Sequence, residues 1–97
     1  MSVIVAGKLY VDPEGRGRFV EEHRVIVEAA RSHPGCLGLS ISPGPVEPGR
    51  VKNFEHGESQ EALGAFRTVV PRPSVSVDIK GDQVLKHEIS HTGPSFG

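Results

Sequence analysis

The seven residues from Pro43 to Gly49 include three prolines and two glycines. Proline has no backbone N–H to offer a helix or an inner strand, and glycine loses much conformational freedom in either, so this segment is predicted to be a loop. Shorter breaks stand at Asp12-Pro13, at His33-Pro34-Gly35 and at residues 71–74. These breaks divide the chain into short segments, so only short helices and strands can form between them.

Alternating apolar side chains predict strands between these breaks. The strands cover residues 3–11, 36–42, 50–57 and 83–91. The second of them is expected to place Leu37, Leu39 and Ile41 on one face. Residues 74–81 fit either a short extended piece or a helical turn.

Apolar side chains at spacings of three and four residues predict two helices. The first covers residues 16–32, and His23 is the polar member of its apolar stripe. The second covers residues 59–70, with Phe66 on its core-facing side. Ser59 stands where an N-cap hydroxyl can accept a hydrogen bond from the first turn of that helix.

The order strand, helix, strand, strand, helix, strand is that of the ferredoxin-like split βαβ fold. The expected fold class is therefore α+β, with an antiparallel four-stranded sheet and two helices on one of its faces. No further helix within the predicted domain, residues 1–91, is available to cover the other face. A second copy of the chain is the simplest cover, so a homodimer is expected. Residues 92–97 are predicted to be a mobile tail or a clasp on a partner.

The balance of charges argues against two classes of partner. Eleven Lys and Arg against twelve Asp and Glu give a net charge of -1, which provides no broad positive field for nucleic acid or an anionic membrane. No apolar run approaches the ~18 residues that cross a bilayer, and residues 1–20 lack the apolar core of a signal peptide. A soluble cytoplasmic protein is expected, and 97 residues suit a single domain.

The cysteine and histidine residues do not predict a metal site. Cys36 is the single cysteine, and with five scattered histidines it fits no zinc-ligand spacing. A reactive thiolate would need a helix N-terminus or a nearby cation, whereas Cys36 follows a predicted helix C-terminus. A small buried apolar role is therefore favoured for Cys36, and no metal ion is expected.

Three segments carry a resemblance to a known family. They are Val3-Ile-Val-Ala-Gly-Lys-Leu9, Ala30-Arg-Ser-His-Pro-Gly-Cys-Leu37 and Asn53-Phe-Glu-His-Gly-Glu-Ser-Gln-Glu-Ala-Leu-Gly-Ala-Phe-Arg67. Together they resemble the antibiotic biosynthesis monooxygenase family of dimeric α+β barrels. The resemblance implies a homodimer whose two sheets pack face to face, with a pocket in each subunit between sheet and helices. Some members oxidise aromatic polyketides with O₂ and without metal or flavin, and relatives degrade haem or act on quinols.

One position departs from the family pattern Glu-x-Trp-x-Ser. This chain reads Glu55-His-Gly57-Glu-Ser59, so a glycine replaces the pocket tryptophan and is expected to enlarge the pocket. Haem degradation, which depends on that aromatic ring, is disfavoured. The resemblance implies that Asn53, four residues before the tryptophan position, binds the substrate or stabilises a developing oxyanion. Its structural alternative is an Asn that caps an edge of the sheet or pairs with a loop.

Four other side chains are candidates for the site, each with a structural alternative. Glu55 can act as a base if burial raises its pKa, or it can pair with Arg67 or another cation. His87 can move a proton near neutral pH, or it can be a partly buried core histidine. His23 can project into the pocket or pack within its helix. Phe66 can line an aromatic pocket or belong to the core.

Two hypotheses about function remain open from the sequence. The first is a cofactor-independent monooxygenase acting with O₂ on a small aromatic or quinol-like molecule. Its catalytic residues would be Asn53, Glu55 and His87, and its substrate-binding residues would be His23, Gly57 and Phe66. The second is a non-catalytic, dimeric small-ligand-binding protein of the same fold, which the glycine at position 57 motivates.

Overall fold

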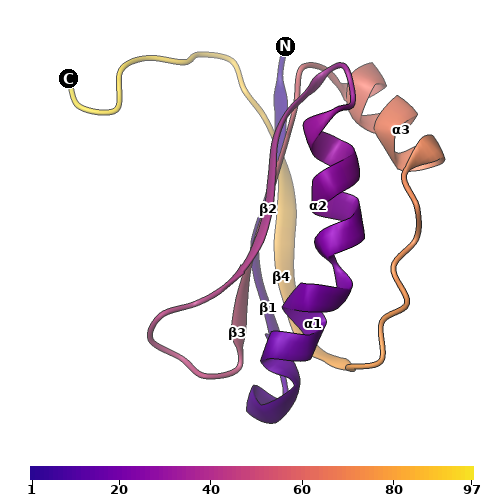
Figure 1. Ribbon diagram of the computed structural model, residues 1–97. Helices are drawn as coiled ribbons and strands as arrows, with labels where there is room; N and C mark the ends of the chain where they lie inside the picture. The colour runs from indigo at the N-terminus through magenta and orange to yellow at the C-terminus, as the bar shows by residue number, and fades with distance from the viewer.

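The computed structural model describes all 97 residues. Its strands are β1 (Val3–Val11), β2 (Cys36–Pro43), β3 (Arg50–Gly57) and β4 (Ile79–Glu88), and its helices are α1 (Arg16–Glu22), α2 (Arg24–Arg31) and α3 (Gln60–Val69). The strands form one antiparallel sheet in the order β2-β3-β1-β4, and the helices lie on one of its faces (Figure 1). The predicted ferredoxin-like α+β fold is confirmed. None of the helices is long and apolar enough to cross a bilayer.

The core forms where α1 crosses the inner strands. Leu9 and Val11 of β1, Phe19 of α1 and Val51 of β3 make one buried cluster. Leu9 and Val51 are direct cross-strand partners, so both side chains leave the sheet on the helix side. Burying a side chain such as Phe19 stabilises the fold by about 1.5–3 kcal/mol, and this packing holds α1 over the sheet.

The segment predicted as one helix over residues 16–32 is two helices, which meet at His23. The His23 ring nitrogen Nδ1 lies 2.7 Å from the Phe19 carbonyl oxygen and donates to it. The His23 backbone N–H, the usual partner of that carbonyl, instead donates to the Val20 oxygen at 3.1 Å. The side chain thus competes with the helix backbone, and the helix breaks at this residue.

Strand β2 contains an irregularity that the alternation of its leucines does not reveal. Its pairing with β3 shifts register between Cys36 and Gly38, so Leu37 is an extra residue and 59% of it is exposed. The bulge brings Cys36 to the helix side of the sheet, where it lies with Gly57 and Leu63. Leu37 lies beside Leu39 and Ala30 of α2 at the edge of the sheet.

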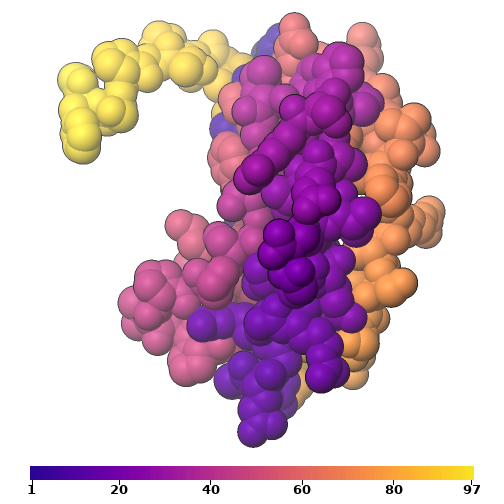
Figure 2. Space-filling model, in the orientation of Figure 1, coloured from indigo at the N-terminus to yellow at the C-terminus, as the bar shows by residue number.

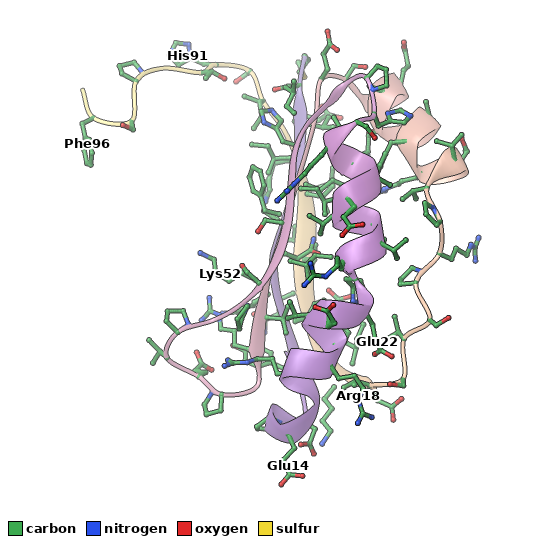
Figure 3. All side chains as sticks on the ribbon, viewed as in Figure 1. Glu14, Arg18, Glu22, Lys52, His91 and Phe96 are labelled. Atoms are coloured by element: carbon green, nitrogen blue, oxygen red, sulfur yellow. The ribbon has the colours of Figure 1, made fainter.

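Strand β4 begins earlier and ends earlier than predicted, at Ile79 and Glu88 rather than at residues 83 and 91. The segment before it contains no helical turn and is held against α1 by Glu22, whose carboxylate accepts hydrogen bonds from the Ser76 backbone N–H and hydroxyl at 3.1 and 2.9 Å. Figure 3 shows Glu22 pointing towards this segment. The ambiguity over residues 74–81 is thus resolved in favour of extended chain.

Two segments project on the side of the sheet that carries no helix. They are the loop between β2 and β3 and the chain after β4, which runs away from the domain and ends beyond the exposed Phe96 (Figures 1 and 3). Figure 2 shows the recess that lies between these two projections. We call this side of the sheet the helix-free face. Leu85, which is 66% exposed, and Phe54, which is 39% exposed, lie on it.

Candidate functional site

The register of β3 decides which candidate side chains can meet. Asn53 pairs with Gly7 of β1 and Ile41 of β2, and Glu55 pairs with Val5 and Leu39. Asn53, Glu55 and Gly57 therefore leave the sheet on the helix side, as predicted, while Phe54 and His56 leave it on the helix-free face.

A groove runs between the helices and the edge strand β2. It has a volume of about 220 Å³, and the apolar side chains of Val20, Val27 and Ile41 line it. Ile41 is the cross-strand neighbour of Asn53 on the same face of the sheet. The Cβ atoms of such neighbours stand about 4.5–5.5 Å apart, so Asn53 lies beside a residue that lines the groove without lining it itself.

Charged side chains surround the mouth of this groove. Arg24 of α2 donates from Nε and Nη2 to the two carboxylate oxygens of Glu21 in α1, at 2.8 and 2.9 Å. These hydrogen bonds hold the pKa of Glu21 below its ordinary value and raise that of Arg24. Both side chains are exposed, so this pair shapes the rim of the groove and contributes little to stability.

Asn53 is half-buried, and its side-chain amide makes no hydrogen bond within the chain. An amide that is held on a strand and has no internal partner can donate to a ligand oxygen without first breaking another bond. The Asn53 amide is thus available to a ligand that reaches it.

Glu55 is buried, with 9% of its surface exposed, and it is ion-paired. Nη2 of Arg67 in α3 donates to its Oε1 at 3.0 Å, while Oε2 accepts no hydrogen bond within the chain. The ion pair that the sequence offered as an alternative is therefore present. It attaches α3 to β3 and fixes the position of the carboxylate.

The space around Gly57 is smaller than the sequence predicted. A Cβ atom at this position would lie 3.2 Å from the Leu63 Cβ and 3.2 Å from the Ser59 carbonyl oxygen. The space between β3 and α3 has no volume for a water molecule. The prediction that the glycine enlarges a pocket is wrong, because Leu63 of α3 occupies that space.

Phe66, His23 and His87 do not gather around one open cavity. Phe66 is buried and packs edge-on against His33. His23 packs against Phe19 with ring centroids 4.4 Å apart, as its structural alternative predicted. His87 is exposed and pairs with Ile4 on the helix-free face, so the prediction of a partly buried core histidine is wrong. The thickness of the sheet separates it from Asn53.

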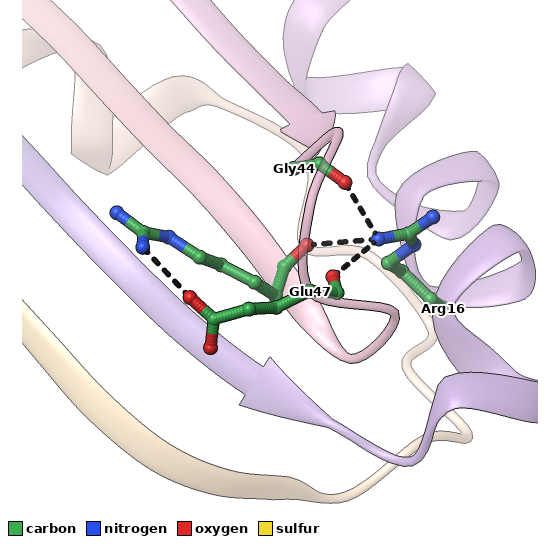
Figure 4. A network of polar contacts seen from close by, with 4 residues as sticks. Arg16, Gly44 and Glu47 are labelled. Atoms are coloured by element: carbon green, nitrogen blue, oxygen red, sulfur yellow. Dashed lines mark hydrogen bonds and ion pairs between the residues drawn. The ribbon is translucent and has the colours of Figure 1, made fainter.

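Sequence reasoning missed the residue that fastens the β2–β3 loop. Nη1 of Arg16 donates to the carbonyl oxygens of Gly44 and Glu47 at 2.9 Å and of Arg50 at 3.4 Å (Figure 4). The available signal was the loop itself, since a proline-rich segment has few backbone N–H donors; the Gly44 carbonyl has no backbone partner, whereas those of Glu47 and Arg50 also accept from the Arg50 and Gly44 N–H groups. Cys36 is half-buried, and no group of three or more His, Cys, Asp or Glu residues could hold a metal ion.

Comparison with known families agrees with this architecture. Residues 2–68 match the model of the family "Antibiotic biosynthesis monooxygenase", and the chain belongs to this family. Membership supports a function of the monooxygenase type. An uncharacterised protein of Synechocystis sp. is 30% identical over 61 residues, which are 63% of this chain and 42% of that protein. The chain thus spans about two fifths of the length of this curated relative.

Solved structures share the fold at low sequence identity. A candidate antibiotic biosynthesis monooxygenase of Deinococcus radiodurans has a TM-score of 0.75 against this chain, with 19% identity and full coverage of both chains. One from Nitrosomonas europaea has a TM-score of 0.72 at 13% identity, over 94% of this chain and all of its own. A heme-degrading protein of Mycobacterium tuberculosis has a TM-score of 0.68 at 20% identity, over 97% of this chain and all of its own.

Proposed function

We propose that the protein is a monooxygenase that oxidises a small aromatic or quinol-like molecule with O₂ and needs neither metal nor flavin. The observation that carries this proposal is Asn53. Its amide has no partner within the chain and stands beside the groove between the helices and β2. Family membership supplies the class of reaction.

The reaction of an anthrone-type substrate shows what the protein must supply. A base removes a proton from the substrate, and the electron-rich anion passes an electron to O₂. Recombination of the two radicals forms a carbon–oxygen bond, and the protonated base returns its proton to the resulting peroxide anion, which gives a hydroperoxide. Loss of water from the hydroperoxide then leaves a carbonyl, so one oxygen atom enters the product, the other leaves as water, and no outside reductant is consumed. Stabilisation of the substrate oxyanion by Asn53 lowers the barrier to the first step.

Glu55 is the base that we assign to this reaction. It leaves β3 on the same face as Asn53 and two residues further along, so the two groups lie about 7 Å apart. The ion pair with Arg67 engages Oε1 and leaves Oε2 free to accept a proton. An aromatic ring spans this separation, but Glu55 lies in the closed space between β3 and α3, so a substrate meets both groups only if that space opens.

Oxygen uptake with a panel of anthrone- and naphthol-type compounds tests the proposal. We expect at least one compound to give enzyme-dependent uptake, with one labelled oxygen atom from O₂ in the product. Heat-inactivated protein is the control. If no compound gives uptake above this control, the protein is not an oxygenase of this kind.

The second candidate is a ligand-binding protein without catalysis, because the absent tryptophan and the closed space beside Gly57 speak against a catalytic site of the family type. Binding of a naphthol without any oxygen uptake would establish it.

The variant Gly57→Trp restores the aromatic ring of the family pattern. Leu63 occupies the space that the ring needs, so this single variant is expected to unfold more readily than the wild type. The double variant Gly57→Trp, Leu63→Ala makes room for the ring. If oxygen uptake appears only in the double variant, the wild-type protein is a binding protein.

A further inference from the structure

The helix-free face contains a hollow of about 540 Å³ that the oxygenase proposal does not use. One row of side chains crosses the strands there, in which Ser42 pairs with Lys52, Lys52 with Lys8, and Lys8 with Gln83. All of these residues line the hollow. Figure 3 shows Lys52 reaching away from the helices.

The two lysines stand directly opposite each other on neighbouring strands. Like charges in this position destabilise a sheet, because the Cβ atoms of such a pair are about 4.5–5.5 Å apart. Neither ammonium group has an ion-pair partner. Arg50 adds a third cation, and no carboxylate lines the hollow. The only acidic group that contacts any of these cations is Glu47, which binds Arg50 at 3.1 Å.

The rest of the lining suits a ligand that is both charged and apolar. Ser40 and Ser42 offer hydroxyl groups, and Gln83 offers an amide. At the other end, Ala6 and Phe54 present an apolar surface, and 39% of Phe54 is exposed. Positive charge, neutral donors and an aromatic ring therefore border one hollow.

We propose that this hollow binds a small organic anion, with its carboxylate or phosphate group between Lys8 and Lys52 and its apolar body against Phe54. The anion would replace the repulsion between the two ammonium groups by attraction to both. Asn53 also borders this hollow, between Lys52 and Phe54 on β3, but its side chain leaves the sheet on the helix side. The hollow is therefore distinct from the groove, which lies on the helix side. If a second copy covers the helix-free face, the anion becomes enclosed between the copies, where its charge is screened less by solvent.

Titration of the full chain with phenyl phosphate, followed by amide NMR spectra, tests this site. Inorganic phosphate is the anion without a ring, and phenol is the ring without a charge. We expect phenyl phosphate to shift the amides around Lys8, Lys52 and Phe54 and to bind more tightly than either reference compound. Equal binding of inorganic phosphate, or of phenol, would contradict the proposal.

Lysine variants locate the binding. Lys52→Gln and Lys8→Gln are each expected to weaken phenyl phosphate binding roughly ten-fold or more, because each removes one charge-assisted contact. Lys80→Gln makes the same change of charge outside the hollow, where Lys80 pairs with Asp12 at 3.6 Å, and should leave the affinity unchanged. Without ligand, Lys8→Gln should melt no lower than the wild type, because it removes a repulsion. An unchanged affinity in both hollow variants, or equal weakening by Lys80→Gln, would overturn the proposal.

Discussion

Asn53 and Glu55 leave the same face of β3, yet their surroundings differ. Glu55 is buried and held by Arg67, whereas the amide of Asn53 is left without a partner. A buried carboxylate needs such a cation, since an isolated charge in the interior is costly. The ion pair thus allows a charged group to remain in the closed space between β3 and α3, which Leu63 and Phe66 also line.

Removal of the cation tests the structural part of this pair. Arg67→Ala leaves the buried Glu55 carboxylate unpaired and is expected to lower the free energy of unfolding by about 1–3 kcal/mol. Urea denaturation at neutral pH measures this change in the free energy of unfolding. The double variant Glu55→Gln, Arg67→Ala should recover part of the loss. If Arg67→Ala is as stable as the wild type, the ion pair does not support α3.

At the scale of elements, the helices and the β2–β3 loop depend on side chains that capture backbone carbonyls. The His23 ring donates a hydrogen bond to the Phe19 carbonyl and ends α1. The Arg16 guanidinium donates hydrogen bonds to the carbonyls of Gly44, Glu47 and Arg50. The first contact divides the helix beside the groove. The second joins the start of α1 to the loop that projects on the helix-free face.

The contacts of Arg16 predict how the loop responds to its loss. Arg16→Ala leaves the Gly44 carbonyl without a donor and removes one of two donors from the carbonyls of Glu47 and Arg50, which also accept from backbone N–H groups. The non-proline amides of residues 44–50 should therefore exchange with solvent faster than in the wild type. The unfolding free energy is expected to fall by about 1–3 kcal/mol. The matched control is Arg18→Ala, because Arg18 lies on the same helix and its side chain makes no hydrogen bond in the structure. Equal exchange in the two variants would show that Arg16 does not hold the loop.

The sequence predicted the order of the elements and the face of Asn53, which depended on the register of β3, since a slip of one residue would have exchanged Asn53 with Phe54. It could not predict which face of β4 meets the helices, since Val84 and Leu85 are adjacent and both apolar. Val84 faces the helices, so His87 lies on the opposite side of the sheet from Asn53. The extra residue Leu37 depends on pairing with β3, which alternation within one strand does not encode.

For the whole molecule, the uncovered sheet face predicts a dimer. Leu85 is 66% exposed there, and the two projecting segments border the same face (Figure 1). Light scattering at micromolar concentration should give twice the chain mass of 10.4 kDa. Leu85→Lys is expected to shift the protein towards the monomer, whereas Val69→Lys, on exposed helix α3, should not. A wild-type mass of one chain would contradict the dimer.

The turnover of Asn53→Ala is the most direct test of the proposed function. With a compound that supports oxygen uptake, this variant should lose roughly 100-fold or more in turnover, as expected when one oxyanion donor is removed, and should unfold at the same temperature as the wild type. His87→Gln, on the other face of the sheet, should keep the wild-type rate. Unchanged turnover in a folded Asn53→Ala variant would contradict the role of Asn53 and the mechanism built on it.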